Sequence, residues 1–336
     1  MTSSDFPLDY YSSFEEEYHA LKDRAVFFRE GRGVLRLQGA ESVDFLQRLS
    51  TNDADPLSEG VIVSSILTTE KAKVVDVCTF IPDQGQILIS TSRGQAETVK
   101  CWLEKYIIME DITVEDISSS LTSYCLINPE ADSFLSSVIG GMAPIVPRKP
   151  FRFDFAGFSY ILFHDNAFSV PVYHLIASRP AFDAYFAKGV HRERLLEVGS
   201  MAFESFRIEQ GVPLVGRDIT DQINPLEASL KRYVSFTKGC YIGQEVIARI
   251  DTYKKLQKEL RGLIIETNEV RTLAPGGLWN ASENIGVTTS HAWSFGVRRQ
   301  VALGFVKTAA ETGAIEYREE SGIRSFPARL SEFPLW

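Results

Sequence analysis

A cysteine that follows a lysine and precedes a predicted helix is the strongest chemical signal in this sequence. The segment KGCYIGQE spans residues 238–245, and the pattern QEVIARI predicts a helix from Gln244. The positive end of a helix dipole and a nearby ammonium group both favour the thiolate, the nucleophilic form of cysteine. Cys240, two residues after Lys238, is therefore a candidate reactive cysteine. Alternatively, Cys240 is a small buried apolar side chain in a glycine-rich turn, and the residues leave both interpretations open.

The spacing of the other cysteines and histidines predicts no metal site. The four cysteines are far apart and form no C-x-x-C pair, and the five histidines are dispersed without an H-E-x-x-H pattern. The sequence therefore provides neither a disulfide framework nor a complete ligand set for an iron–sulfur cluster.

Strands and helices alternate in the first part of the chain. Apolar periodicity predicts helices over 14–23, 40–49 and 96–106, and strands over 33–38, 61–67, 74–80, 86–90, 112–117 and 122–127. The mixture is typical of an α+β fold. A segment rich in glycine and proline, GGMAPIVPRKP at 140–150, predicts a domain boundary.

The second part of the chain changes from a mixed pattern to short strands. Strands are expected over 151–155, 158–163 and 172–177, and helices over 180–188, 191–199 and 200–209. Closely spaced strands at 261–266, 286–290 and 301–306 predict a small C-terminal β-barrel. The length of 336 residues predicts two or three domains.

Composition and charge exclude several classes of protein. Hydrophobic residues make up 44% of the 336 residues and charged residues 24%, as in ordinary globular domains. The net charge of −9 opposes broad affinity for nucleic acid. No apolar run is long enough for a membrane span, and the acidic N-terminus resembles neither a signal nor a transit peptide. A cytoplasmic location is therefore expected.

Three motifs resemble a known family. The segment KGCYIGQE, with Arg249 following it, is similar to the K-G-C-Y-x-G-Q-E signature of the YgfZ family of folate-binding proteins, which are related to the aminomethyltransferase (T-protein) of the glycine cleavage system. FRIEQGVP at 206–213 and FLQRLSTND at 45–53 resemble two further family segments. The resemblance covers roughly residues 25–310. It implies three domains around a central folate-binding hole: an α+β domain over 1–140, a middle α+β domain over 141–255 that carries KGCYIGQE, and a β-barrel over 256–336.

The resemblance also implies roles for two acids. Glu209, in the R-I-E segment, would accept paired hydrogen bonds from a pterin; the alternative is an ion pair with Arg207 or Arg217. Asp76 lies in AKVVDV, which is similar to the G-G-I-x-D-D segment whose aspartate assists attack by the folate nitrogen in the aminomethyltransferases. This chain keeps one of the two acids and neither glycine. Because strand residues alternate faces, a shift of one position would turn Asp76 away from the site.

Three residues in and after the cysteine segment are candidate ligand contacts. Lys238 and Arg249 are expected to bind the glutamate tail of a folate or to position a partner, or else to be surface cations. Tyr241 is expected to stack on an aromatic ligand, or else to pack beside the glycines.

The function implied by the resemblance is that of a tetrahydrofolate-binding accessory protein for the assembly or repair of iron–sulfur proteins. Cys240 would be its working thiol, iron–sulfur client or assembly proteins its partners, and any effect on tRNA modification indirect. The chain is expected to be a monomer without contact to nucleic acid or membrane. The alternative is a tetrahydrofolate-dependent aminomethyltransferase, which would require the paired aspartates and a G-Y-T-G-E-type middle segment. A folate-binding scaffold without turnover is a third interpretation.

Overall fold

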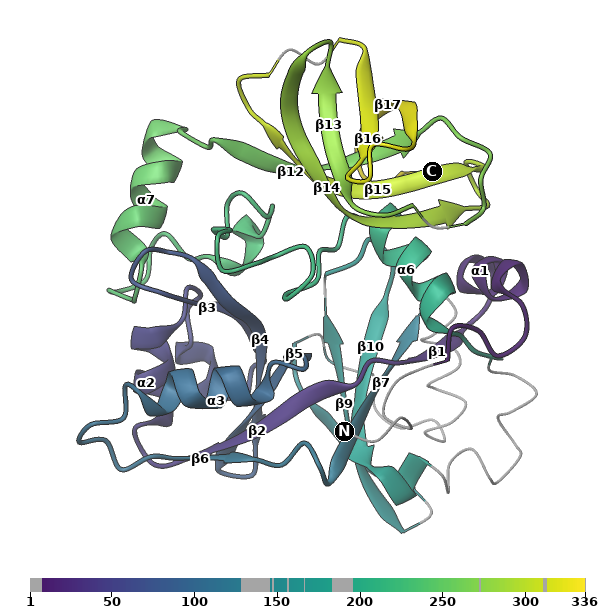
Figure 1. Ribbon diagram of the computed structural model, residues 1–336. Helices are drawn as coiled ribbons and strands as arrows, with labels where there is room; N and C mark the ends of the chain where they lie inside the picture. Colours follow the sequence, from purple (N-terminus) through teal and green to yellow (C-terminus); the bar gives the residue numbers. More distant parts are fainter. Residues whose placement is uncertain are drawn as a thin grey trace.

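Two β-sheets and a closed β-barrel organise the chain in the computed structural model (Figure 1). The structure describes residues 8–127, 146, 148–155, 157–165, 167–182, 196–271, 273–310 and 313–335. The predicted boundary at residue 140 and most of the predicted helices over 180–188 and 191–199 lie outside the described residues. Leu196 and Glu197, at the end of the latter range, form a strand and not a helix. They pair in parallel with Val26 and Phe27.

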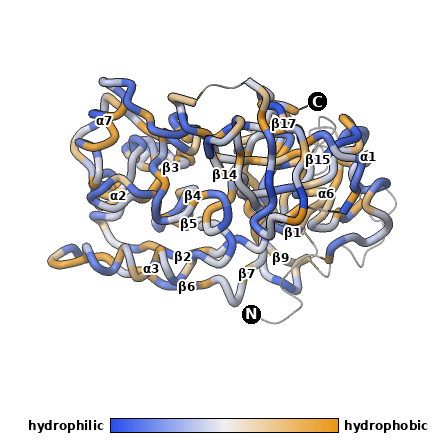
Figure 2. The backbone as a smooth tube through the Cα atoms, turned by 45° about the horizontal axis from the view of Figure 1, so that its top comes forward, coloured by the Kyte–Doolittle hydropathy of each residue, from blue (hydrophilic) through white to orange (hydrophobic). Residues whose placement is uncertain are grey.

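The first sheet has five strands in the order β3-β4-β5-β2-β6. Two helices, α2 (Ser42–Leu49) and α3 (Ala96–Glu104), pack on it through buried apolar side chains such as Phe45 and Val99. In Figure 2 apolar residues recur between hydrophilic ones along both helices, as expected for amphipathic helices with one buried face. The strands are β2 (Arg32–Gln38), β3 (Val63–Thr68), β4 (Val74–Asp83), β5 (Gln86–Arg93) and β6 (Thr113–Asp116).

The second sheet draws its strands from distant parts of the chain. Its order is β11-β1-β7-β10-β9-β8, so strands that precede residue 140 pair with strands that follow it. The chain passes from this sheet to the first one through Glu30 and Gly31, which separate β1 from β2. The strands are β1 (Val26–Arg29), β7 (Leu121–Ile127), β8 (Phe151–Phe155), β9 (Phe158–Asp165), β10 (Val172–Ser178) and β11 (Leu196–Glu197).

The predicted C-terminal barrel is confirmed. It is closed, with strand order β12-β15-β14-β13-β16-β17, and it caps the two sheets in Figure 1. Closure pairs both edges of the sheet and buries one apolar cluster inside. The strands are β12 (Lys258–Ile265), β13 (Gly276–Asn280), β14 (Glu283–Ser294), β15 (Arg299–Lys307), β16 (Ile315–Glu319) and β17 (Ser325–Ser331).

Three further helices connect these units. Helix α6 (Ser200–Glu209) lies between the barrel and the second sheet, and α1 (Phe14–Asp23) packs beside it. Helix α7 (Gln244–Tyr253) begins at the residue predicted from the cysteine segment. Two 3₁₀ helices are η2 (Asp55–Glu59) and η3 (Lys231–Tyr233), and residues 179–182 are helical as well. Within the described residues no helix is both long and apolar enough to cross a membrane.

Candidate functional site

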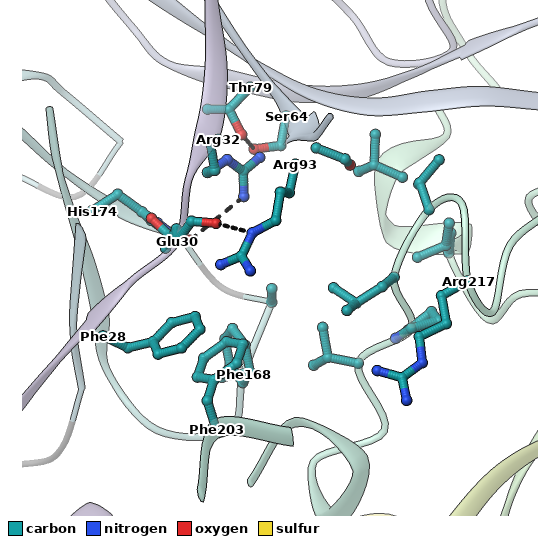
Figure 3. Close-up of a pocket in the computed structure, with 18 of the residues that line it drawn as sticks. Phe28, Glu30, Arg32, Ser64, Thr79, Arg93, Phe168, His174, Phe203 and Arg217 are labelled. Carbon is teal, nitrogen blue, oxygen red and sulfur yellow. Dashed lines mark hydrogen bonds and ion pairs between the residues drawn. The ribbon is translucent and has the colours of Figure 1, made fainter. Parts of the chain in front are cut away.

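A cavity of about 430 Å³ lies where the two sheets, α6 and the segment 212–217 meet (Figure 3). Strands from both sheets contribute its walls, and none of the lining residues that the structure describes belongs to the barrel. The lining residues that carry polar or aromatic side chains are Phe28, Glu30, Arg32, Ser64, Thr79, Ser92, Arg93, Phe168, His174, Ser200, Phe203, Glu204, Arg217, Arg232 and Tyr233.

One end of the cavity carries a buried carboxylate–imidazole pair. Oε2 of Glu30 lies 2.8 Å from Nδ1 of His174, and both side chains are nearly inaccessible to solvent. Burial opposes ionisation of Glu30, yet His174, Arg32 and Arg93 together hold the pKa of Glu30 below its usual range. Glu30 is therefore a carboxylate at neutral pH and can only accept hydrogen bonds.

Arg93 fixes the backbone that carries this carboxylate. Its Nε donates to the carbonyl oxygen of Glu30 at 2.5 Å, and its Nη2 donates to that of Arg29 at 2.9 Å. The residues that join β1 to β2 are thus held against the end of β5, and Glu30 is oriented by a neighbouring strand of the other sheet.

Aromatic rings form an apolar wall beside the charged groups. The rings of Phe28 and Phe203 are stacked with centroids 3.8 Å apart, and Phe168 lies next to them. An apolar wall next to a few fixed polar groups is the usual composition of a site for a small organic molecule.

The opposite side of the cavity is anchored by a network on α6. Glu204 accepts hydrogen bonds from Arg217 and from Arg207, which is fully buried and also donates to Asp218 and to Ser290 of the barrel. Burial disfavours the charged form of Arg207, but Glu204 and Asp218 stabilise it and keep the pKa of Arg207 raised. Through these contacts Arg207 connects α6, the loop after it and the barrel. In Figure 3 Arg217 lies across the cavity from Glu30.

Asp76 lies behind the cavity wall. Its neighbour Val77 lines the cavity, whereas Asp76 is fully buried among residues on the other face of β4. Oδ2 of Asp76 accepts hydrogen bonds from the backbone N–H of Ser92 and the thiol of Cys78. Burial raises the pKa of Asp76, although Ser92 and Arg32 favour its ionised form. The cavity-facing position of this segment therefore carries a valine.

Glu209 also lies outside the cavity lining. Its carboxylate accepts a hydrogen bond from the hydroxyl of Tyr18 and lies 3.9 Å from the ammonium of Lys22, both on α1. The alternative ion pair with Arg207 or Arg217 is not formed, because both arginines pair with Glu204. Burial raises the pKa of Glu209.

The cysteine segment forms a separate site on the surface. Cys240 is exposed, so the interpretation of a buried thiol is wrong. Lys238 does not point to a ligand: its Nζ donates to the carbonyl oxygens of Gln47, Ser50 and Asn52 at 2.6–2.8 Å. Burial lowers the pKa of Lys238 to about 8.

Two further predicted residues lie near this loop. Tyr241 is buried and packs in the apolar cluster that includes Ile247 of α7, with the ammonium of Lys238 5.3 Å from its ring centroid. Arg249 is exposed on α7. The structure thus brings Lys238, Cys240 and Tyr241 together, and places neither Asp76 nor Glu209 with them.

Sequence reasoning missed the charged groups of the cavity. Glu30, Arg93 and His174 come from β1, β5 and β10, or directly follow them, and only the folded sheets bring them together. One local feature of the sequence did point to Glu30. The run VFFREGR places charged residues directly after a strand that is otherwise apolar, which marks polar groups entering a buried environment.

Comparison with known proteins supports the fold. Residues 4–151 match the family model described as the GCVT N-terminal domain. The chain is 27% identical over 334 residues to an aminomethyltransferase of Aquifex aeolicus, covering 96% of this chain and 87% of the relative. It is 26% identical over 281 residues to a chloroplastic protein of Arabidopsis thaliana whose name describes it as a transferase. That match covers 83% of this chain but only 64% of the plant protein.

A solved structure extends the likeness over nearly the whole chain. The glycine cleavage system aminomethyltransferase T from Bartonella henselae superposes with a TM-score of 0.85 at 21% identity, over 98% of this chain and 91% of that one. The expected α+β architecture with a C-terminal barrel is thereby confirmed. The chain has the fold of the glycine cleavage aminomethyltransferase, and its residues 4–151 match the GCVT N-terminal domain.

Proposed function

We propose that the cavity between the two sheets binds a reduced folate, with tetrahydrofolate as the principal ligand. The observation that carries the proposal is the lining: an aromatic wall next to fixed charged groups, in a volume of about 430 Å³. This volume suits a ligand of the size of a folate. Four lining arginines face two lining glutamates, and this excess of positive charge favours the carboxylates of a folate tail.

Titration with reduced folates tests the binding proposal. We expect tetrahydrofolate to bind the wild type, and Phe203→Ala to weaken binding by about tenfold because an aromatic face beside the ligand is lost. Phe295→Ala is the matched control, since Phe295 packs on Tyr18 and lies outside the cavity lining. If the wild type binds no reduced folate, or if the two variants bind equally well, the proposal fails.

The relatives favour one use of the folate. Several of them are named aminomethyltransferases, so the first candidate reaction is transfer of the one-carbon unit of an aminomethyl group to tetrahydrofolate, with release of ammonia and of the carrier thiol. It is tested by incubating the protein with tetrahydrofolate and an aminomethyl-loaded lipoyl carrier protein, and by measuring methylenetetrahydrofolate. Formation of that product at a rate well above the background would establish the reaction.

Two local features of the structure favour a different role for the bound folate. The cavity-facing position next to Asp76 carries a valine, so the described cavity wall offers no carboxylate from this strand. Cys240 is exposed on a loop away from the cavity. These features support the second candidate: a folate-binding accessory protein for iron–sulfur proteins, affecting tRNA modification only through its clients. It predicts no product in the transfer assay and reduced activity of iron–sulfur enzymes in cells without the gene.

A further inference from the structure

We propose that Glu30 and His174 recognise the pterin ring of the folate, so that its glutamate tail extends toward Arg217. This inference rests on the proposed folate binding and specifies how the ligand is oriented in the same cavity. Glu30 would touch the ligand directly, and His174 would position Glu30.

Glu30 has acceptor capacity that no residue described in the structure uses. Its Oε2 pairs with His174 at 2.8 Å, whereas its Oε1 lies 3.8 Å from Nη1 of Arg32, which is beyond hydrogen-bonding distance. The side chain lies at the cavity surface with little exposure to solvent. A desolvated carboxylate is stabilised by donors, and a ligand that brings two donors meets this need.

The pterin ring has the matching pattern of donors. Its 2-amino group and the adjacent ring N–H lie in one plane and point in the same direction, so a carboxylate can accept both in parallel. Each carboxylate oxygen offers two lone-pair positions, so Oε2 can keep its bond to His174 while the group binds the ring. Phe168 lies near Glu30 in the cavity lining and adds apolar surface for a flat ring, whereas the ring of Phe28 is covered by Phe203 and Arg93.

His174 is held in a way that suits a positioning role. Its ring stacks on that of Phe163 at 4.9 Å with an interplanar angle of 21°, and its Nδ1 faces Glu30. An imidazole N–H that donates from Nδ1 fixes the rotation of the carboxylate. Arg93 fixes the backbone of the same residue, so the acceptor is oriented before a ligand arrives.

The opposite side of the cavity suits the anionic tail. Arg217 and Arg232 line the cavity, and both side chains reach solvent. Figure 3 shows Arg217 across the cavity from Glu30. A folate that places its pterin on Glu30 therefore directs its glutamate toward cations at an accessible end.

The test measures binding of the pterin half and of the glutamate half of the ligand separately. Affinities of wild type, Glu30→Gln and the control Glu209→Gln are measured for tetrahydrofolate, for 6-methyltetrahydropterin and for p-aminobenzoylglutamate. We expect Glu30→Gln to lose at least about tenfold in affinity for the first two ligands and to keep its affinity for the third. Glu209→Gln should match the wild type for all three. His174→Gln, which retains a donor, should bind the pterin better than His174→Phe.

A second measurement needs no variant. The wild type should bind 6-methyltetrahydropterin at least about tenfold more tightly than the analogue with a 2-oxo group in place of the 2-amino group. Equal binding of these two compounds overturns the inference, as does a Glu30→Gln protein with unchanged pterin affinity. The guanine base of guanosine presents the same edge, an amino group, a ring N–H and an oxo group in a row, and preferential binding of guanosine would also overturn the inference. If the wild type binds no folate at all, the proposed function fails instead.

Discussion

The hydroxyl of Tyr18 donates a hydrogen bond of 2.5 Å to the carboxylate of Glu209. The same hydroxyl accepts one from the backbone N–H of Gly296 and lies 3.2 Å from Oγ of Ser294 in the barrel. One phenol thus joins α1, α6 and the end of β14. The family resemblance implies that Glu209 contacts a ligand; in the structure Tyr18 binds its Oε1, and its Oε2 is buried without a hydrogen-bond partner among the described residues.

This contact set leads to a prediction for Glu209→Gln. The resemblance predicts a loss of folate affinity of at least about tenfold, since a charged acceptor for the pterin would be removed. The position of Glu209 outside the cavity lining predicts an affinity within about threefold of the wild type. Titration of both proteins with tetrahydrofolate decides between the two, and a tenfold loss would contradict the geometric assignment.

Two glycines of the cysteine segment are predicted to differ in their tolerance of alanine. Gly243 has a φ of +83°, and a Cβ there would lie 2.7 Å from the carbonyl oxygen of Thr69. Gly239 has open space around the corresponding position. We expect Gly243→Ala to lower the free energy of unfolding by about 1–3 kcal/mol, and Gly239→Ala to change it by less than about 1 kcal/mol. Equal effects in urea unfolding would argue against the strain at residue 243.

The four cysteines are predicted to react in two groups. Cys240 and Cys101 are exposed, whereas burial raises the pKa of Cys78 and of Cys125 well above the usual range. In the native protein, iodoacetamide should therefore modify the first two and spare the others. Peptide mapping after brief labelling measures this, and rapid labelling of Cys78 would contradict the described core.

A functional test uses Cys101→Ala as the matched control for Cys240→Ala. Both substitutions remove an exposed thiol, so each should change the free energy of unfolding by less than about 0.5 kcal/mol. If Cys240 is the working thiol, only Cys240→Ala will fail to restore iron–sulfur enzyme activity in a strain without the gene. Full restoration by Cys240→Ala would remove this thiol from the proposed function.

Acid is predicted to destabilise the protein through His291. Its Nε2 lies 2.8 Å from Oγ1 of Thr288, and burial, together with Arg217, lowers its pKa to about 3. The unfolded chain takes up a proton here below about pH 6.5, whereas the folded protein does so only near pH 3. The stability contributed by neutral His291 is therefore fully present above pH 6.5 and is lost as the pH falls from 6.5 toward 3.

The measurement compares how steeply the free energy of unfolding changes with pH in each protein. One proton contributes at most about 1.4 kcal/mol per pH unit, and His291→Gln should remove this contribution between pH 6.5 and 4. Urea unfolding at several pH values gives the slope for the wild type, for His291→Gln and for His19→Gln, whose histidine is exposed. The same slope in all three proteins would contradict the assignment.

Lys238 is predicted to hold the cysteine loop against the end of α2. Lys238→Met removes three hydrogen bonds to backbone carbonyls and should cost about 1–3 kcal/mol. It should also speed alkylation of Cys240, because the loop loses its anchor. The control is Lys231→Met, which removes an exposed pair with Asp251 that contributes little. Unchanged stability and unchanged alkylation in Lys238→Met would contradict the anchoring role.

Local sequence patterns predicted the elements well. The helix over 14–23 and the helix start at Gln244 agree with α1 and α7, because capping residues and apolar periodicity act over a few residues. The same patterns missed β1, since four residues are too few to show a periodicity. The strands β13, β16 and β17 were missed as well.

The candidate site was less accessible to sequence reasoning. Cys240 and Lys238 share one segment, so their proximity could be predicted, but the direction of Lys238 could not, because its three acceptors belong to α2 and the residues after it. Glu30 and His174 are 144 positions apart and meet only through the pairing of β1, β7 and β10. No local pattern contains such a contact.

The mixed origin of the six-stranded sheet has a consequence for synthesis on the ribosome. All strands of the five-stranded sheet lie between residues 32 and 116, so that sheet can form as soon as this stretch has emerged. Strand β1 precedes it in the chain, yet its partner β11 is translated more than 150 residues later. Strand β1 can therefore pair with β11 only late in synthesis. The cavity, whose walls come from both sheets and α6, becomes available to a ligand only after α6 has emerged.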